Sequence, residues 1–120
     1  MVLPKGVNDF QLTKNFNLRE FMSPDTCEVM IYPELVDKLQ DLRDYLDKPI
    51  KVTSGYRTPE RNKAVGGVEG SYHLIGKAVD ILVDSPEDVV RKYANLSGFS
   101  YCKYYPNTKH FHLDIGKIRM

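Results

Sequence analysis

Three histidines and two aspartates stand at spacings that could build a metal site. From residue 110 to 114 polar and apolar residues alternate, so an extended backbone places His110, His112 and Asp114 on one face of a strand. The remaining histidine, His73, lies in a segment bounded by glycines, and Asp80 follows it seven residues later. Asp80 stands between apolar residues, where a buried carboxylate needs a partner because an unpaired charge is costly.

Two histidine nitrogens and one carboxylate oxygen are a donor set suited to zinc, with a fourth position left to water. Zinc bound in this way lowers the pKa of its water and polarises a carbonyl group, which favours hydrolysis of an amide bond. Two alternatives stay open on these residues. Alternation at 110–114 is also typical of a solvated edge strand. The same donors form the facial triad of non-haem iron oxygenases. Those enzymes need more strands, and their first histidine and the acid are fewer residues apart than His73 and Asp80.

The elements that must position these residues follow from apolar periodicity. After Pro33, leucines recur every three or four residues up to Leu46 and predict a helix with one face against the core. Other expected elements are a short helix capped by Asn17, a helix over 59–65 capped by Thr58, a loop over 68–76, a helix that opens at 85–88 and runs to about 94, strands at 50–53 and 78–82, and a hairpin of 99–105 with 110–115.

Helices on one side of a small mixed or antiparallel sheet give an α+β fold. At 120 residues the chain has the size of one domain, so we expect a single domain over 1–120, with 1–15 as an extended N-terminal arm.

Composition narrows the possible partners. Lys and Arg number 17 against 16 Asp and Glu, interspersed along the chain, which gives no basic footprint for nucleic acid. No stretch approaches the roughly 20 apolar residues of a membrane span, and the first residues lack the apolar run of a signal peptide. We therefore expect a monomer made in the cytoplasm without membrane insertion, in which Cys27 and Cys102 are reduced thiols.

The sequence resembles the zinc D-alanyl-D-alanine peptidase superfamily (peptidase family M15), which includes phage endolysins and the amino-terminal signalling domain of hedgehog proteins. The signature of that superfamily is Ser-x-His-x-x-Gly-x-Ala-x-Asp, followed later by a histidine on a strand. The matching residues are Ser71, His73, Gly76, Ala78, Asp80 and His112. The likeness extends to 54–57, 62–67, 104–106 and 110–114, and so covers about half of the chain.

The resemblance implies a role for each residue of the site. It makes His73, Asp80 and His112 the ligands of a zinc ion. It makes Arg57 the cation that holds a substrate carbonyl or carboxylate, a task that suits a forked guanidinium, and His110 a group that stabilises the oxyanion or shuttles a proton.

Two further roles have simpler alternatives. The resemblance makes Ser71 a hydrogen-bonding partner of substrate or of a ligand, although a serine at this position is also typical of a loop cap. Arg57 could likewise form only a surface ion pair with Glu60.

The general base is the position at which the chain departs from the family. Many members carry a carboxylate three residues before the last histidine, where this chain has Lys109. Asp114 is the leading replacement because it shares a strand face with His112, and Glu69 is the second. A third possibility is that Asp114 only orients a histidine ligand.

The resemblance implies hydrolysis of peptidoglycan stem peptides at D,D- or L,D-type bonds. Without a signal peptide, such an enzyme is expected to be a phage or prophage endolysin that reaches the cell wall on lysis, or part of a virion. The alternative is a non-catalytic, hedgehog-like module in which zinc serves folding or partner binding.

Overall fold

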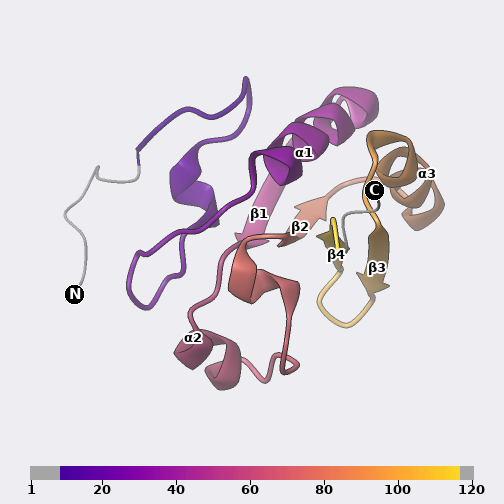
Figure 1. Cartoon of the computed structure of the whole chain (residues 1–120). Helices are drawn as coiled ribbons and strands as arrows, with labels where there is room; N and C mark the ends of the chain where they lie inside the picture. Colours follow the sequence, from indigo (N-terminus) through magenta and orange to yellow (C-terminus); the bar gives the residue numbers. More distant parts are fainter. Residues whose placement is uncertain (1–8, 117–120) are drawn as a thin grey trace.

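A four-stranded antiparallel sheet forms the centre of the computed structural model, which describes residues 9–116 (Figure 1). Its strands lie in the order β1 (Ile50–Ser54), β2 (Ala78–Val83), β4 (His110–Asp114) and β3 (Tyr101–Tyr105). Each neighbouring pair is antiparallel, and β3 and β4 form the predicted hairpin. The α+β prediction is confirmed, with an antiparallel sheet.

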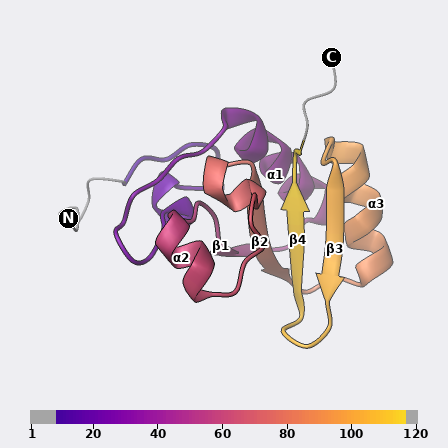
Figure 2. The same cartoon turned by 60° about the horizontal axis from the view of Figure 1, so that its bottom comes forward.

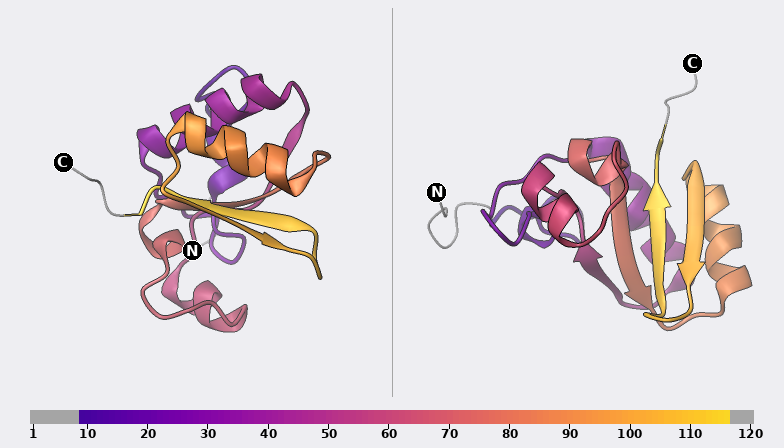
Figure 3. Two further views of the ribbon diagram at one scale, coloured as in Figure 1. Left: turned by 90° about the vertical axis from the view of Figure 1, so that its right-hand side faces the viewer. Right: turned by 90° about the horizontal axis from the view of Figure 1, so that it is seen from below.

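Helices of different length lie on the two sides of this sheet. The predicted long helix α1 (Pro33–Leu46) lies beside α3 (Glu87–Ser97) on one face (Figure 3). The short α2 (Pro59–Ala64) and a 3₁₀ helix, η2 (Tyr72–Ile75), lie on the other side. The sequence predicted only a loop where η2 forms, because a single turn of helix leaves too short a periodic pattern to detect.

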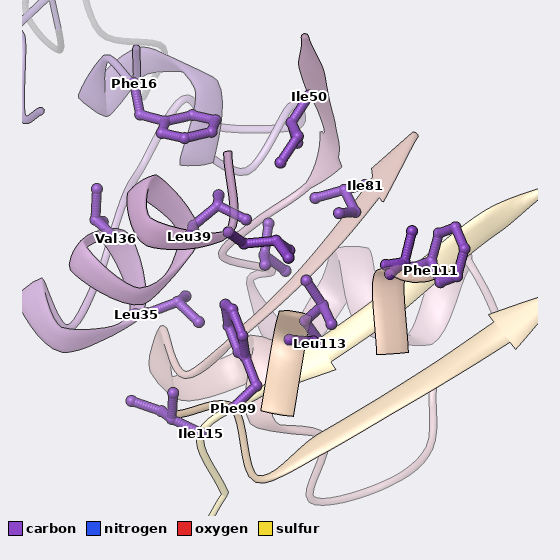
Figure 4. Packing of buried hydrophobic residues seen from close by; sticks show 14 of the residues in the cluster. Phe16, Leu35, Val36, Leu39, Ile50, Ile81, Phe99, Phe111, Leu113 and Ile115 are labelled. Atoms are coloured by element: carbon purple, nitrogen blue, oxygen red, sulfur yellow. The ribbon is translucent and has the colours of Figure 1, made fainter. Parts of the chain in front are cut away.

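The apolar core fills the space between the sheet and the two longer helices. Ile81 of β2 and Phe111 and Leu113 of β4 belong to one cluster with the leucines of α1, and at most 1% of each of these three residues is exposed (Figure 4). Because side chains alternate along a strand, the intervening residues Asp80 and His112 project from the opposite face. The fold thus separates the core from the candidate site.

The N-terminal segment is held against α1. Residues 1–8 of the expected arm lie outside the described residues. Gln11 forms an isolated bridge with Asn17, and the Thr13 hydroxyl donates a hydrogen bond of 2.7 Å to the Gln40 side chain. The helix expected after Asn17 is the 3₁₀ helix η1 (Leu18–Phe21), which begins with a capping box.

The structure also shows the state of the two cysteines and the character of the helices. Cys27 and Cys102, both half-buried, are not joined to each other by a disulfide. Within residues 9–116, no helix combines the length and the apolar composition needed to cross a bilayer.

Candidate metal centre

The three predicted ligands converge from three different elements. Asp80 of β2 and His112 of β4 are direct partners in the sheet register, on strands that lie side by side (Figure 2). The 3₁₀ helix η2 brings His73 to the same point. The Oδ1 atom of Asp80 lies 3.2 Å from Nε2 of His73 and 3.0 Å from Nδ1 of His112. One donor atom from each of the three residues lies within 4.8 Å of the donor atoms of the other two. Tetrahedral zinc with bonds of about 2.0–2.1 Å holds its ligand atoms roughly 3.3 Å apart, so this donor set fits the ion.

Hydrogen bonds at the outer nitrogens orient both histidine ligands. The Nδ1 atom of His73 lies 2.7 Å from the Gly55 carbonyl, which can only accept, so Nδ1 donates and the lone pair of Nε2 faces Asp80. The Nε2 atom of His112 lies 2.9 Å from Oδ2 of Asp114 and donates to it, which aims Nδ1 at Asp80. Lone pairs facing a carboxylate need a cation or a proton between them. Such outer contacts are a usual part of metal sites.

Electrostatics show how the site holds a proton in place of a metal. Burial raises the pKa of Asp80, but its contacts with the imidazoles of His112 and His73 outweigh burial and hold the pKa of this carboxyl well below its ordinary value. Burial lowers the pKa of His112, but hydrogen bonds with Asp114 and Asp80 raise it by more than burial lowers it. The net pKa of His112 is about 9. The site therefore favours a positive charge between His112 and Asp80.

The segment around His73 is more buried than the sequence suggested. We expected this histidine at the tip of a loop, but it is only 1% exposed because η2 turns it inward. The Ser71 hydroxyl caps η2 by accepting a hydrogen bond of 3.2 Å from the His73 backbone N–H, and Ser71 also lines the cleft over the ligands, so its contact with substrate stays a prediction beside the cap role. Gly76 ends η2 with φ 73°, and a Cβ there would lie 2.3 Å from the Met30 carbonyl oxygen. The glycine is needed for this close approach.

Arg57 is bound inside the site and not to Glu60, its alternative partner. Its guanidinium donates to Oδ2 of Asp80 at 3.1 Å and to the Ser54 hydroxyl at 3.1 Å. A third hydrogen bond of 3.2 Å goes to the Asn62 side chain. Burial lowers the pKa of Arg57, and Asp80 opposes that shift. Arg57 thus fixes the second oxygen of Asp80 while Oδ1 faces the histidines.

Asn62 is a functional residue whose role the sequence did not reveal. It is 5% exposed, accepts from Arg57 and donates to the Val68 carbonyl at 3.0 Å. A Cβ at Gly67 would lie 2.0 Å from the Asn62 side-chain oxygen, so only glycine allows this packing. Asn62 lies within the resembling segments, but a lone asparagine after a helix cap gives no signal of its own.

His110 lies beside the ligands without joining their cluster. Its Nε2 atom is 3.9 Å from Oδ2 of Asp80, and its ring stacks on Tyr105 with 4.7 Å between centroids. The Thr108 hydroxyl contacts its Nδ1 atom. A ring held in this way is placed to meet a group bound next to the metal, as the resemblance implies.

The candidates for general base lie in different surroundings. Asp114 is 6% exposed and its carboxylate accepts from His112, which favours the orienting role over proton abstraction. Glu69 is exposed and lines a separate hollow beside α2. Lys109 lies in the hairpin turn with φ 58°. Neither Asp114 nor Glu69 is among the described residues that line the cleft over the ligands, so the general base stays a prediction.

A cleft of about 450 Å³ opens over the three ligands. Tyr101, Tyr105 and His110 of the β3–β4 hairpin line one side, and residues of the segment 65–72 line the other. A larger hollow of about 840 Å³ between α3 and β3 contains none of the ligands, so the smaller cleft is the candidate site.

Comparisons with known proteins identify the family. No curated protein matches the sequence. A crystal structure of the Serratia marcescens L-Ala D-Glu endopeptidase ChiX is similar, with 25% identity and a TM-score of 0.45 over 69% of this chain and 80% of that one. The family model described as Peptidase M15 matches residues 8–114, nearly the whole length. The chain therefore belongs to the peptidase M15 family.

Proposed function

We propose that this protein is a zinc-dependent peptidase that hydrolyses D,D- or L,D-type bonds in the stem peptides of peptidoglycan. The observation that carries the proposal is the convergence of His73, Asp80 and His112 at the bottom of an open cleft in a peptidase M15 chain. Both histidines are oriented by outer hydrogen bonds, and the cleft leaves room for water and a peptide on one side. The wall-peptide substrate follows from the resemblance to D-alanyl-D-alanine peptidases.

The residues around the ligands divide the chemistry among them. When bound, zinc supplies a Lewis acid that activates water and polarises the scissile carbonyl. Arg57 holds Asp80 and keeps two of its five N–H groups for a substrate oxygen. His110, 3.9 Å from Asp80, faces the position of the reacting group and carries the proton that no free carboxylate can take. Asp114 keeps the ring of His112 in the ligating orientation.

The missing family base also favours a second candidate, a non-catalytic zinc module that binds a partner. Among the described residues that line the cleft, Asp80 is the only carboxylate, and it is engaged by Arg57 and the histidines. The oxygenase alternative has no support, because the family is that of a peptidase and the sheet formed by the described residues has four strands. For the peptidase, the expected setting is a phage or prophage endolysin or a virion component acting on the cell wall as a monomer.

Digestion of purified cell walls tests this function. Walls are incubated with the zinc-loaded protein, with and without a chelator, and the released muropeptides are identified by mass spectrometry. We expect new peptide termini that vanish with the chelator and return when zinc is restored. Intact stem peptides after incubation with folded protein that holds one zinc ion would instead establish the non-catalytic module.

A further inference from the structure

A lysine stands in the same row of the sheet as two metal ligands. The register pairs Asp80 of β2 with His112 of β4, and His112 with Lys103 of β3. Side chains at paired positions project from the same face, and neighbouring strands lie about 4.8 Å apart. Lys103 therefore projects from the face that carries the site, one strand beyond His112. Its strand, β3, is the outermost of the sheet (Figure 2).

Two tyrosines that line the cleft flank this lysine on β3. Tyr101 and Tyr105 lie two residues before and after it and are 51% and 38% exposed. The Lys103 ammonium lies 4.9 Å from the centroid of the Tyr105 ring, whose plane stacks on His110. Tyr101 meets His112 edge-on at 6.1 Å between centroids. The lysine is thus tethered over an aromatic surface continuous with the metal site.

The positive charge of Lys103 is not matched by a carboxylate of the site, which favours an anionic ligand beside it. The carboxylates of the site are already used, since Asp80 is held by Arg57 and Asp114 accepts from His112. Within residues 9–116, Lys103 forms no ion pair with an acidic side chain. Arg57 lies deeper, where three hydrogen bonds fix its guanidinium and its two remaining N–H groups serve the substrate oxygen of the proposed function. Lys103 is accordingly a second cation, beside the cleft, whose charge is available for a different anionic group.

We infer that Lys103, with Tyr101 and Tyr105, forms a subsite that binds a free carboxylate of the peptide substrate near the scissile bond. This inference rests on the proposed function and specifies its substrate. One strand spacing of about 4.8 Å plus a lysine reach of about 6 Å spans at most about three residues of extended peptide at about 3.3–3.6 Å each. The carboxylate therefore lies within about three residues of the bond that is cut, and its apolar neighbours contact the tyrosine rings.

A matched set of lysine variants and peptides tests the subsite. The probes are a synthetic stem pentapeptide, L-Ala-D-Glu-L-Lys-D-Ala-D-Ala, and two versions amidated at the D-Glu or the C-terminal carboxylate. Zinc-loaded wild type is compared with Lys103→Met and Lys103→Arg. Lys92→Met is the control, because Lys92 also lies over a tyrosine ring, at 5.4 Å from Tyr93, but on α3 away from the cleft.

For the unmodified peptide we expect Lys103→Met to raise KM about fivefold to tenfold with little change in kcat, and Lys103→Arg to restore most of the affinity. The increase should disappear for one of the two amidated peptides and shrink at high salt. Lys92→Met should match wild type. An unchanged KM in Lys103→Met, or an increase that persists with both amides, overturns the subsite.

Binding separates this result from a failure of the proposed function. If wild type leaves all three peptides intact, the peptidase proposal is wrong, and the dissociation constant measured by calorimetry replaces KM in the same comparison. Weaker binding of the unmodified peptide by Lys103→Met then still supports the subsite. Equal binding by wild type and Lys103→Met overturns it.

Discussion

Zinc must displace a proton from His112, and this competition makes metal affinity depend on pH. Asp114 and Asp80 raise the pKa of His112 to about 9 in the metal-free protein, so near neutral pH its ring carries a proton at each nitrogen. At pH 7, removing one of these protons costs roughly 3 kcal/mol, because the pH lies about two units below the pKa of about 9. The apparent affinity for zinc should therefore rise about tenfold per pH unit from pH 7 to 8.5.

Competition with a chelator of known zinc affinity measures this slope, and calorimetry in buffers of different ionisation enthalpy counts the released protons. We expect about one proton per zinc at pH 7.5 from this ring. His110→Gln serves as the control and should keep the slope, since His110 is not a ligand. A zinc affinity that is flat between pH 7 and 8.5, with no proton released, would refute the assignment of His112 and its partners.

The stability of the metal-free protein provides an independent check of the sign. The folded pKa of His112 lies above its ordinary value of 6.5, so protonation stabilises the fold fully below pH 6.5. This contribution declines as the pH rises from 6.5 to about 9, and the total loss is at most about 3 kcal/mol. Denaturant unfolding of the metal-free chain at pH 6.5 and at about pH 9 should show this decrease in the free energy of unfolding.

Three substitutions give further expected outcomes. Asp114→Asn should weaken zinc binding about 10- to 100-fold while turnover at saturating zinc stays within about fivefold; loss of turnover with zinc in place would make Asp114 the base after all. Arg57→Ala should retain stoichiometric zinc, measured by metal analysis, but lower kcat/KM at least tenfold, because Asp80 loses a partner and the substrate a donor. Gly76→Ala should lower the free energy of unfolding by about 1–3 kcal/mol, read from chemical denaturation, since its φ of 73° and the Met30 carbonyl exclude a methyl group; unchanged stability would contradict the tight approach.

Local patterns were sufficient to predict most of the elements, and the family resemblance supplied the candidate ligand set. Alternation over 110–114 correctly separated the core residues from His112, and the leucine spacing of α1 gave its bounds. Both signals depend only on neighbours along the chain, which is why sequence contains them. The pairing of Asp80 with His112 requires β2 and β4 to be neighbours in the sheet. That neighbourhood is set by the tertiary fold and cannot be read from local sequence patterns.

The outer contacts of the site could not be predicted because they join segments through side-chain direction. The bond from His73 to the Gly55 carbonyl depends on how η2 turns inward, and that depends on Gly76 meeting the Met30 backbone. The same reason explains why Glu69 looked close in sequence yet lies in a separate hollow. Asn62, which ties Arg57 to the cleft wall, is equally silent in a single sequence.

The position of the metal centre relative to the core bears on what the metal is for. The apolar side chains of β2 and β4 pack against α1 and α3, whereas the ligands project from the opposite face into a cleft. Arg57 and the proton on His112 already compensate the charge of Asp80 when no metal is bound. Zinc at this site would therefore not be required to neutralise a buried carboxylate. Under the proposed function, an ion held at an open cleft is better explained by chemistry on a ligand than by structural support.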